Sequence, residues 1–557
     1  MRTFAIALSL AALLAAGCSS TETPHAKSPR PGRAATVEKP ADRLSNLHHP
    51  VSTKNADAQR HFDDGLTLCY AFNHDEAIRS FKKALAADEN LAMAHWGIAY
   101  ALGPNYNVDV DAEREKQAAQ HIATAAELAK KTNAPQAEKD YIATMARRFS
   151  GADNPDLKQL ANDYAKAAGE LSKKYPDDLD AATLHAEAMM CLRPWKLWTK
   201  DYQPAEGTEQ VVAVLESVLK RDPDHVGANH LYIHSVEASR TPGRALEAAA
   251  RLPGLAPECG HLVHMPSHIY ARVGDHESAV TSNEQAVDID RAYFKQNPQG
   301  KGGMYEMMYY PHNVHFCAYA EAWQGNHKAA KEWARQLYDL ASPHVAHMAM
   351  MEGFTAVPMG IEVKFRRWDD ILKSESPDAK TMPITTAMWH FGRGMAQASK
   401  GDVAQANSEK QKFLALKNGL PKDHMFGMLN KADHVLSIAQ HVLDAKIARA
   451  QGNLAEACDQ LQAAVALEDD LTYMEPPDWL SPARESLGGV LLQASKPAEA
   501  EKIFREDLDK NPRGGRSLFG LIQALEAQGK TYDASMLKPQ LDTAWKNADT
   551  KLRVEDL

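Results

Sequence analysis

The sequence predicts an all-α fold built from repeated pairs of helices, and three observations carry this prediction. The chain has 557 residues, more than one compact core accommodates, so several domains or an elongated repeat array are expected. Apolar residues recur with a helical period, and few segments alternate as strands do. Short Gly-Asn, Gly-Asp, Asp-Pro and Asn-Pro turns interrupt the helical stretches.

The first residues have the pattern of a secretion signal. Met1 and Arg2 precede an apolar run, residues 4–16, that is too short to span a bilayer but suits a signal-peptide core. The run leads into Leu14-Ala15-Ala16-Gly17-Cys18, which resembles the bacterial lipobox, where a cysteine is lipidated and becomes the mature N-terminus. The resemblance implies a signal peptide over residues 1–18 and lipidation of Cys18. Ordinary cleavage in the same region, giving a soluble periplasmic protein, is the alternative.

A serine, Ser19, follows the predicted lipidated cysteine. The absence of aspartate there resembles lipoproteins sorted to the outer membrane. We therefore expect a protein of the bacterial cell envelope, anchored by lipid and facing the periplasm. Residues 19–47 are rich in Ser, Thr, Pro, Ala and Lys, which predicts a flexible tether, and residues 48–557 form the predicted helical body.

Charge and cysteine usage exclude two classes of protein. The chain carries 63 basic and 73 acidic residues, and no basic block with interleaved aromatic residues occurs, so no nucleic-acid partner is expected. Without lipidated Cys18, five widely spaced cysteines remain and no CxxC occurs, which predicts small apolar residues inside helices and no disulfide framework. They are Cys69, Cys191, Cys259, Cys317 and Cys458.

Two sets of small and aromatic residues mark an internal repeat. One set, near the C-terminal end, is Gly488, Ala500, Phe504 and Pro512. The other, near the N-terminal end, is Gly65, Ala77, Phe81 and Ala84. Both spacings resemble the tetratricopeptide signature, in which small residues let two antiparallel helices approach and the aromatic ring fills the gap to the next repeat. The resemblance implies a right-handed superhelical solenoid of helix-turn-helix repeats with a concave face.

Weaker units continue this repeat in phase. Each has a turn glycine followed by a small residue: Gly274 with Ala279, Gly325 with Ala330, Gly401 with Ala406, and Gly452 with Ala457. The resemblance covers residues 56–548, and the family period predicts ten to twelve helix pairs. Two segments rich in Pro, Trp and Tyr, residues 103–111 and 193–207, are predicted to be loop insertions on the solenoid.

Histidine pairs at helical spacing mark the centre of the chain. His230 and His234 form one H-x-x-x-H, and His264 and His268 form another 34 residues later. Residues four apart lie on one helix face, and neighbouring helices stand about 8–10 Å apart, so the four imidazoles can converge. In the resemblance these positions line the concave groove. The predicted groove residues are His230, His234, His261, His264, His268, Arg272, His312, His315 and Tyr319.

Three interpretations of these histidines remain open. The groove recognises a protein, peptide or small organic ligand, with His268 or Arg272 meeting an anion. Alternatively, a transition metal, Cu, Zn or Fe, binds His230, His234, His264, His268 and His315, and nearby Met265, Met304, Met307 and Met308 suit Cu(I). In the third interpretation the histidines are structural: they pack and form hydrogen bonds where neighbouring helices meet.

An enzyme is the less favoured class. The chain contains no H-E-x-x-H, no G-x-S-x-G, no P-loop and no dinucleotide-binding glycine motif in its structural context. A three-histidine metal centre with Glu237 or Glu187 as base would contain the residue types that hydrolysis or oxidation needs, but the sequence shows no catalytic motif that joins them. The sequence therefore predicts a binding or scaffold protein with a protein or peptide partner.

Overall fold

The computed structural model describes residues 43–557, and within this range the chain is all-α. No strand occurs there apart from two isolated bridges, Trp198 with Pro204 and Met425 with Lys431. The predicted signal peptide, Cys18 and most of the predicted tether lie outside the described residues. In the described part, no helix combines the length and the apolar character needed to cross a membrane.

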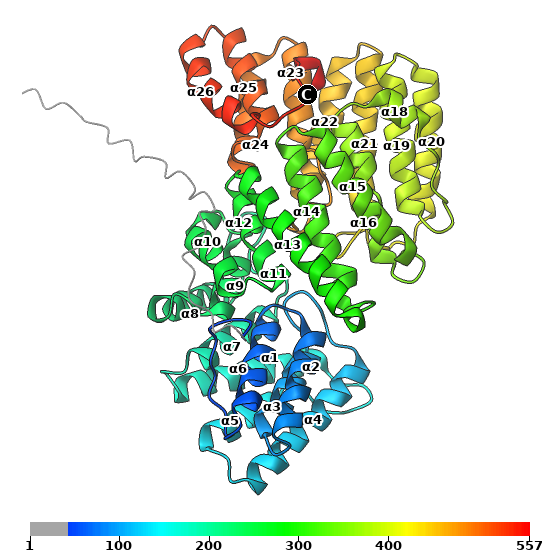
Figure 1. Ribbon diagram of the computed structural model, residues 1–557. Coiled ribbons are helices and arrows are strands. Elements are labelled where there is room, and N and C mark those ends of the chain that lie inside the picture. Colours follow the sequence, from blue (N-terminus) through cyan, green and yellow to red (C-terminus); the bar gives the residue numbers. More distant parts are fainter. Residues whose placement is uncertain (1–42) are drawn as a thin grey trace, which may run out of the picture.

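The N-terminal part, drawn from blue to green in Figure 1, stacks short helices in antiparallel pairs. Its helices are α1 Ala56–Tyr70, α2 His74–Ala87, α3 Ala92–Leu102, α4 Ala112–Lys131, α5 Gln136–Met145, α6 Leu157–Lys174, α7 Leu179–Met190, α8 Thr208–Arg221, α9 Val226–Val236, α10 Leu246–Leu255, α11 Gly260–His264 and α12 Pro266–Arg272. The segment before α1 already makes ordered contacts, since Ser45 Oγ lies 2.7 Å from Thr67 Oγ1. The packed body thus begins before residue 48.

The C-terminal part continues the stack and curves away from the first part (Figure 1). Its helices are α13 His276–Gln296, α14 Tyr310–Trp323, α15 His327–Ala341, α16 Glu352–Thr355, α17 Val357–Lys364, α18 Trp368–Lys373, α19 Pro383–Ser399, α20 Val403–Gly419, α21 Ala432–Ala450, α22 Leu454–Asp469, α23 Ala483–Gln493, α24 Pro497–Lys510, α25 Gly515–Ala527 and α26 Thr531–Ala544. A π-helical turn, Tyr305–Tyr309, precedes α14.

The repeat signature has the predicted packing role at both ends. An added Cβ on Gly65 or on Gly97 would come within 2.6 and 2.5 Å of the Phe81 ring, so this ring fills the space between α1 and α3. Gly488 and Gly520 flank the Phe504 ring in the same way, at 2.4 and 2.2 Å. A small residue on each neighbouring helix is what lets the ring fit. The all-α tetratricopeptide-type solenoid predicted from the sequence is confirmed.

The turn glycines also have the predicted conformation. Gly274, Gly325, Gly401 and Gly452 have φ between 75° and 81°, which favours glycine. The small residue five positions after each is fully buried.

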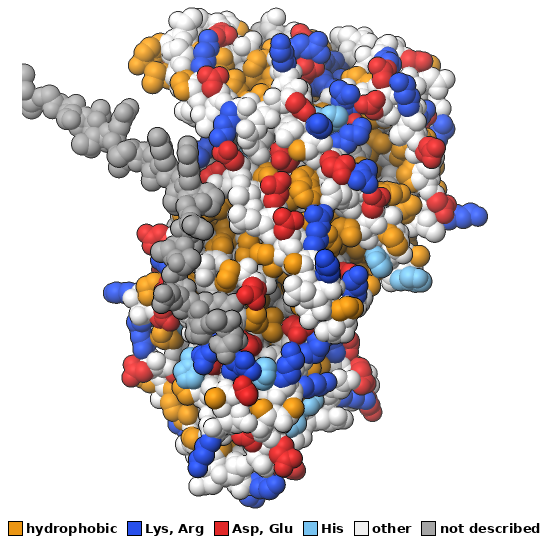
Figure 2. Space-filling model, in the orientation of Figure 1, with side chains coloured by type: hydrophobic (Ala, Val, Ile, Leu, Met, Phe, Trp, Pro, Cys, Tyr) orange, Lys and Arg blue, Asp and Glu red, His pale blue; other side chains and the backbone are white. Residues whose placement is uncertain are grey.

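Both predicted insertions, residues 103–111 and 193–207, are non-helical, and α4 and α8 begin directly after them. On the face in Figure 2, acidic and basic side chains are interspersed.

Candidate metal centre

Four helices from consecutive repeats carry six histidines into one buried cluster. His230 and His234 come from α9, His261 and His264 from α11, His268 from α12, and His312 from α14. Five of the rings are at most 2% exposed, and His312 is partly buried. Neighbouring ring centroids lie between 4.7 and 5.7 Å apart along the row from His230 to His312.

The six rings divide into two triads. His230, His234 and His261 form the first triad, and His264, His268 and His312 form the second. Within each triad, one nitrogen from every ring lies within 4.8 Å of the others. The closest approaches join Nε2 atoms: 3.2 Å between His230 and His261, and 2.9 Å between His264 and His268.

These separations are near those of ligand atoms on one ion. Metal–imidazole bonds of about 2.0–2.1 Å put two tetrahedral ligand nitrogens about 3.3 Å apart. One pair of nitrogens in each triad is therefore already near this separation, and the third ring lies within 4.8 Å. The donor set fits a transition metal, because neutral imidazole is its most common protein ligand.

Partners on the outer side of the rings orient four of the six histidines. The Nδ1 of His230 lies 2.6 Å from the backbone oxygen of Tyr70, and the Nδ1 of His264 lies 2.6 Å from Asn283 Oδ1. The Nδ1 atoms of His234 and His268 lie 2.8 and 2.5 Å from the two oxygens of Glu237. The Nδ1 atoms of His230, His234 and His264 face acceptors and donate to them, and His268 Nδ1 forms an ion pair with Glu237. The Nε2 atoms are therefore directed inward, as in metal-binding histidines.

The Asn283 amide is held with its Oδ1 toward His264, as a hydrogen bond from His264 Nδ1 requires. Its Nδ2 donates to the backbone oxygen of Ala279 over 2.7 Å, which leaves Oδ1 facing His264. Two other ring nitrogens, His234 Nε2 and His261 Nδ1, are buried and have no hydrogen-bond partner in the described part of the chain. Unpaired buried polar atoms are costly, and a bound ion would satisfy the Nε2 of His234.

Burial sets the charge state of the cluster. It lowers the pKa of His230, His261, His264 and His312 well below 6.5, so these rings are neutral at pH 7. Burial also disfavours the charged form of His268, but Glu237 and Glu475 outweigh it and raise its pKa to about 9. Without a metal, the His268 imidazolium therefore forms an ion pair with Glu237 through Nδ1 and donates to His264 through Nε2. Metal binding would displace the Nε2 proton.

Aromatic and thioether side chains enclose the cluster. The Phe72 ring contacts His230 and His261 at centroid distances of 4.5 and 5.4 Å, and Phe316 contacts His268 at 5.1 Å. His234, His261, His268 and His312 line a small, mainly apolar cavity. Its wall includes Trp195, Met308, Phe354, Met428 and Met474. Open coordination positions of the triads would face this cavity.

The prediction of an open groove is wrong for these histidines. The insertion loops cover the concave side: Tyr106 lies 5.2 Å from the His234 ring, and Trp195 lies 5.9 Å from it. The loop at residues 471–482 adds Glu475 over His268. Repeat spacing predicts which residues share a face, but it does not predict which loops fold over that face.

Three predicted site residues lie away from the triads. His315 meets Phe354 edge to face at a centroid distance of 5.7 Å and lines a neighbouring cavity, and His261 and His312 complete the two triads in its place. Tyr319 packs between Phe316 and Trp323. Arg272 donates to the backbone oxygen of Glu237 and lies 3.7 Å from Glu475, so it supports the site from outside.

Sequence reasoning missed Glu475, Asn283 and Phe72. Glu475 lies 3.5 Å from His268 Nδ1, although the two residues are far apart in sequence. The surrounding Tyr-Met-Glu-Pro-Pro segment predicts a loop but does not indicate that the loop reaches the histidines. Of the four methionines considered for Cu(I), Met308 lines the cavity, whereas Met304 is 39% exposed.

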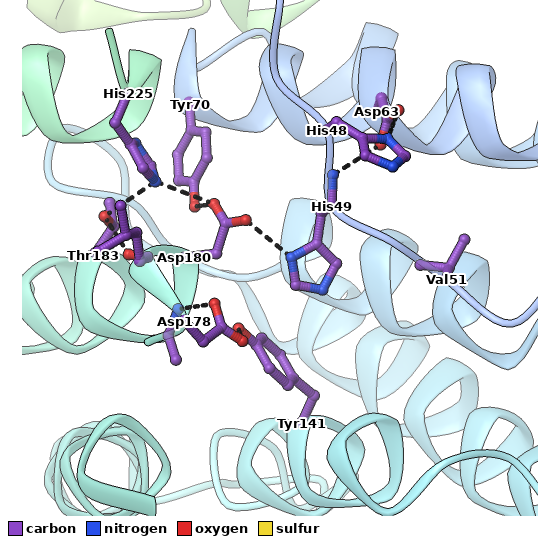
Figure 3. Close-up of polar contacts among 12 residues, drawn as sticks. His48, His49, Val51, Asp63, Tyr70, Tyr141, Asp178, Asp180, Thr183 and His225 are labelled. Carbon is purple, nitrogen blue, oxygen red and sulfur yellow. Dashed lines mark hydrogen bonds and ion pairs between the residues drawn. The ribbon is translucent and has the colours of Figure 1, made fainter. Parts of the chain in front are cut away.

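A second polar cluster, drawn in Figure 3, differs because its groups satisfy one another. Asp180 accepts from Tyr70 over 2.7 Å and pairs with His49 at 2.8 Å and His225 at 3.3 Å. Asp178 caps α7 and accepts from the Tyr141 hydroxyl at 2.7 Å. His49, Asp178 and Asp180 have metal-ligand types, but these bonds already tie the segment before α1 to α7 and α9. We interpret this cluster as structural.

Comparisons with known proteins leave the function open. No family model matches the chain. A 61-residue segment, 11% of this chain and 8% of its relative, is 43% identical to an uncharacterized protein of Aquifex aeolicus (strain VF5), so the chain matches less than a tenth of that relative's length. The human IFIT1 dimer with m7Gppp-AAAA is 14% identical over 89% of this chain and 91% of its own, with a TM-score of 0.34. The APC/C hetero-tetramer Cut9-Hcn1 is 13% identical over 86% and 78%, with a TM-score of 0.30.

Proposed function

We propose that this chain binds transition-metal ions at the two histidine triads, with one ion held by each. The observation that carries the proposal is the orientation of the rings. Acceptors hold the Nδ1 atoms of His230, His234, His264 and His268, and the inward Nε2 atoms approach at 3.2 and 2.9 Å across each triad. A hydrogen bond between two rings accounts for each close approach, whereas an ion would also engage the third ring of each triad.

The ligand chemistry narrows the choice of ion. Imidazole nitrogens suit Zn, Cu, Fe and Ni, whereas Mg and Ca prefer carboxylate and carbonyl oxygens. The carboxylates next to the triads, Glu237 and Glu475, lie on the Nδ1 side of His268. Met308 and Met474 line the same cavity, and their thioethers favour Cu(I). Three protein ligands per ion leave a position for an exogenous ligand, which is the pattern of catalytic rather than structural zinc sites.

Recognition of a protein or peptide by these histidines fits the structure less well. Five of the six rings are at most 2% exposed, so a macromolecule has no access to them. Helical-repeat solenoids are binding scaffolds in general, and a partner on another face is compatible with the metal proposal.

Metal titration of the full mature chain tests the proposal. We expect the metal-free protein to take up close to two equivalents of Zn²⁺ or Cu⁺, and His230→Ala with His261→Ala to remove one of them. His95→Ala with His121→Ala is the matched control, because these two rings also face each other, at 2.9 Å, without a third histidine ligand. If the native chain bound no more metal than the variant that lacks both His230 and His261, the proposal would be refuted.

We also propose that the chain is anchored to the bacterial envelope by a lipid on Cys18, in the outer membrane facing the periplasm. The support is the lipobox-like Leu-Ala-Ala-Gly-Cys sequence and the serine that follows it. Feeding cells an alkyne-tagged fatty acid should label the native chain and the Cys69→Ala control equally. Labelling that persists in Cys18→Ala would contradict lipidation at this residue.

A further inference from the structure

A second cavity lies inside the C-terminal part of the solenoid, and none of the six triad histidines lines it. It lies between α17, α19, α21, α23 and the loop at residues 471–482. Its empty space is about 1440 Å³, counting the open mouth. The wall is mainly apolar, with Met350, Phe354, Met388, Phe391, Met395 and Trp479. A concave space with this lining is typical of sites for apolar ligands.

One end of this cavity is cationic. Lys364, Arg366, Lys446, Arg449 and Arg516 all line it. Arg516 binds the Glu485 carboxylate at 2.6 Å, and Lys364 reaches the same carboxylate only at 3.8 Å. Arg366 and Arg449 donate to the backbone oxygen of Glu555, and Arg366 also lies 3.7 Å from the Asp556 carboxylate. Among the described residues, the ion pairs of these five cations involve only two carboxylates, those of Glu485 and Asp556.

Two lysines in particular have no carboxylate within hydrogen-bonding distance. The Lys364 side chain is 2% exposed, and its Nζ makes no hydrogen bond among the described residues. The Lys446 Nζ lies 5.5 Å from the centroid of the Trp368 ring and makes no ion pair in the described part of the chain. Burial, together with Arg366 and Arg449, lowers the pKa of Lys446 to about 7. An anion at this place would relieve both effects.

The apolar and cationic parts follow each other along α17. Val357, Gly360, Val363 and Lys364 recur at helical spacing and all line the cavity. Seven residues of helix span about 10 Å, so Lys364 lies about 10 Å along α17 from Val357. Met308, Phe354, Met428 and Met474 line both this cavity and the one at the triads, so the apolar end lies toward the metal centre.

We propose that this cavity binds a free fatty acid, with the acyl chain among the methionine and aromatic side chains and the carboxylate at Lys364 and Lys446. An acyl chain needs no polar partners, and the wall offers few. A single carboxylate matches the unpaired charge at one end. The inference does not depend on metal binding, because neither lysine is near the triads and the ligand requires no ion.

Binding of dodecanoate and dodecan-1-ol to the full chain, stripped of bound lipid, tests the inference by calorimetry. We expect dodecanoate to bind at least tenfold more tightly than the alcohol, and Lys446→Met to weaken dodecanoate binding at least tenfold while leaving the alcohol unchanged. Lys502→Met, at a side chain that is 77% exposed, is the matched control. Lys364→Met should act like Lys446→Met, which provides a second variant if the first does not fold.

The other outcomes overturn the inference. Equal affinity for dodecanoate and dodecan-1-ol, unchanged by either lysine substitution, would remove the role of the cationic end. Absence of binding by both compounds would show that the cavity is not a lipid site. A fatty acid recovered by mass spectrometry from the purified native chain, and lost in Lys446→Met, would support it. None of these results bears on the metal stoichiometry, so the two proposals fail separately.

Discussion

The carboxylate of Glu237 lies 2.5 Å from Nδ1 of His268, and both side chains are 1% exposed. The other Glu237 oxygen lies 2.8 Å from Nδ1 of His234, so one carboxylate bridges the two triads on their outer side. The two histidines lower the pKa of Glu237 to about 2, although burial opposes this. The carboxylate is therefore ionised at neutral pH and holds one histidine of each triad with its Nε2 directed inward.

Replacing this bridge should weaken both metal sites together. Glu237→Gln keeps the shape but removes the charge, and loss of an outer partner typically costs 10–100-fold in metal affinity. We expect a reduction in this range for both equivalents, measured by competition with a chromophoric chelator. Glu216→Gln is the control. Glu216 lies on α8 and accepts hydrogen bonds from Tyr232 and Arg244, and it does not face a histidine. Unchanged affinity in Glu237→Gln would mean that the carboxylate plays no part.

The assignment of His261 in place of His315 makes a direct prediction. His261→Ala should lower metal uptake by about one equivalent, because its Nε2 lies 3.2 Å from that of His230. His315→Ala should leave the stoichiometry unchanged, because this ring packs edge to face against Phe354 and belongs to neither triad. Elemental analysis of both variants, purified in parallel, decides between them. Equal losses would restore His315 to the metal set.

The structural cluster around Asp180 should contribute to stability rather than binding. Asp180→Asn leaves His49 and His225 without their charged partner, and breaking a buried pair in this way costs about 3–5 kcal/mol. The carboxylate also counteracts burial at His49 and raises its pKa, so the imidazolium form is favoured. Urea unfolding measures the loss. Asp177→Asn, at a fully exposed side chain, should change stability by less than about 0.5 kcal/mol.

The repeat packing predicts the effect of a single methyl group. Gly65→Ala would place Cβ 2.6 Å from the Phe81 ring, so the ring must shift and the expected cost is about 1–3 kcal/mol. Gly419→Ala, at the exposed end of α20, meets no atom within 4 Å and should be neutral or stabilising. Thermal unfolding of both variants tests this. A neutral Gly65→Ala would contradict the close packing of α1 against Phe81.

One buried carboxyl group predicts a pH dependence of stability. Burial raises the pKa of Glu352 to about 7, and its Oε1 accepts from the Thr385 backbone N–H at 2.8 Å. The folded state therefore binds the proton more tightly than the unfolded state. The resulting stability is fully present below about pH 4.5 and is lost as the pH rises through 7.

Glu352→Gln should remove this dependence. Relative to the native chain, the variant should be more stable at pH 8 by up to about 3 kcal/mol, and little changed at pH 4. Chemical unfolding at the two pH values provides the comparison. An equal difference at both values would mean that Glu352 does not titrate with a raised pKa.

The sequence by itself determined the helical repeat and the pairing of the histidines. Small residues at Gly65 and Gly488 and rings at Phe81 and Phe504 recur at the family spacing because each ring needs the space that a glycine on the neighbouring helix leaves. The 34-residue offset between the H-x-x-x-H pairs placed them on equivalent helix faces for the same reason. Local periodicity is enough for such features, since each repeat contacts mainly its neighbours.

Only the tertiary structure decided how the histidines are used. Glu475, Asn283 and Phe72 reach the cluster from a distant loop, the next helix and a turn, and no spacing in the sequence relates them to His268. The loops around Tyr106 and Trp195 turn a predicted open groove into a buried site. The physical reason is that contacts across a solenoid depend on how its turns curve and where loops fold back. Repeat periodicity encodes neither.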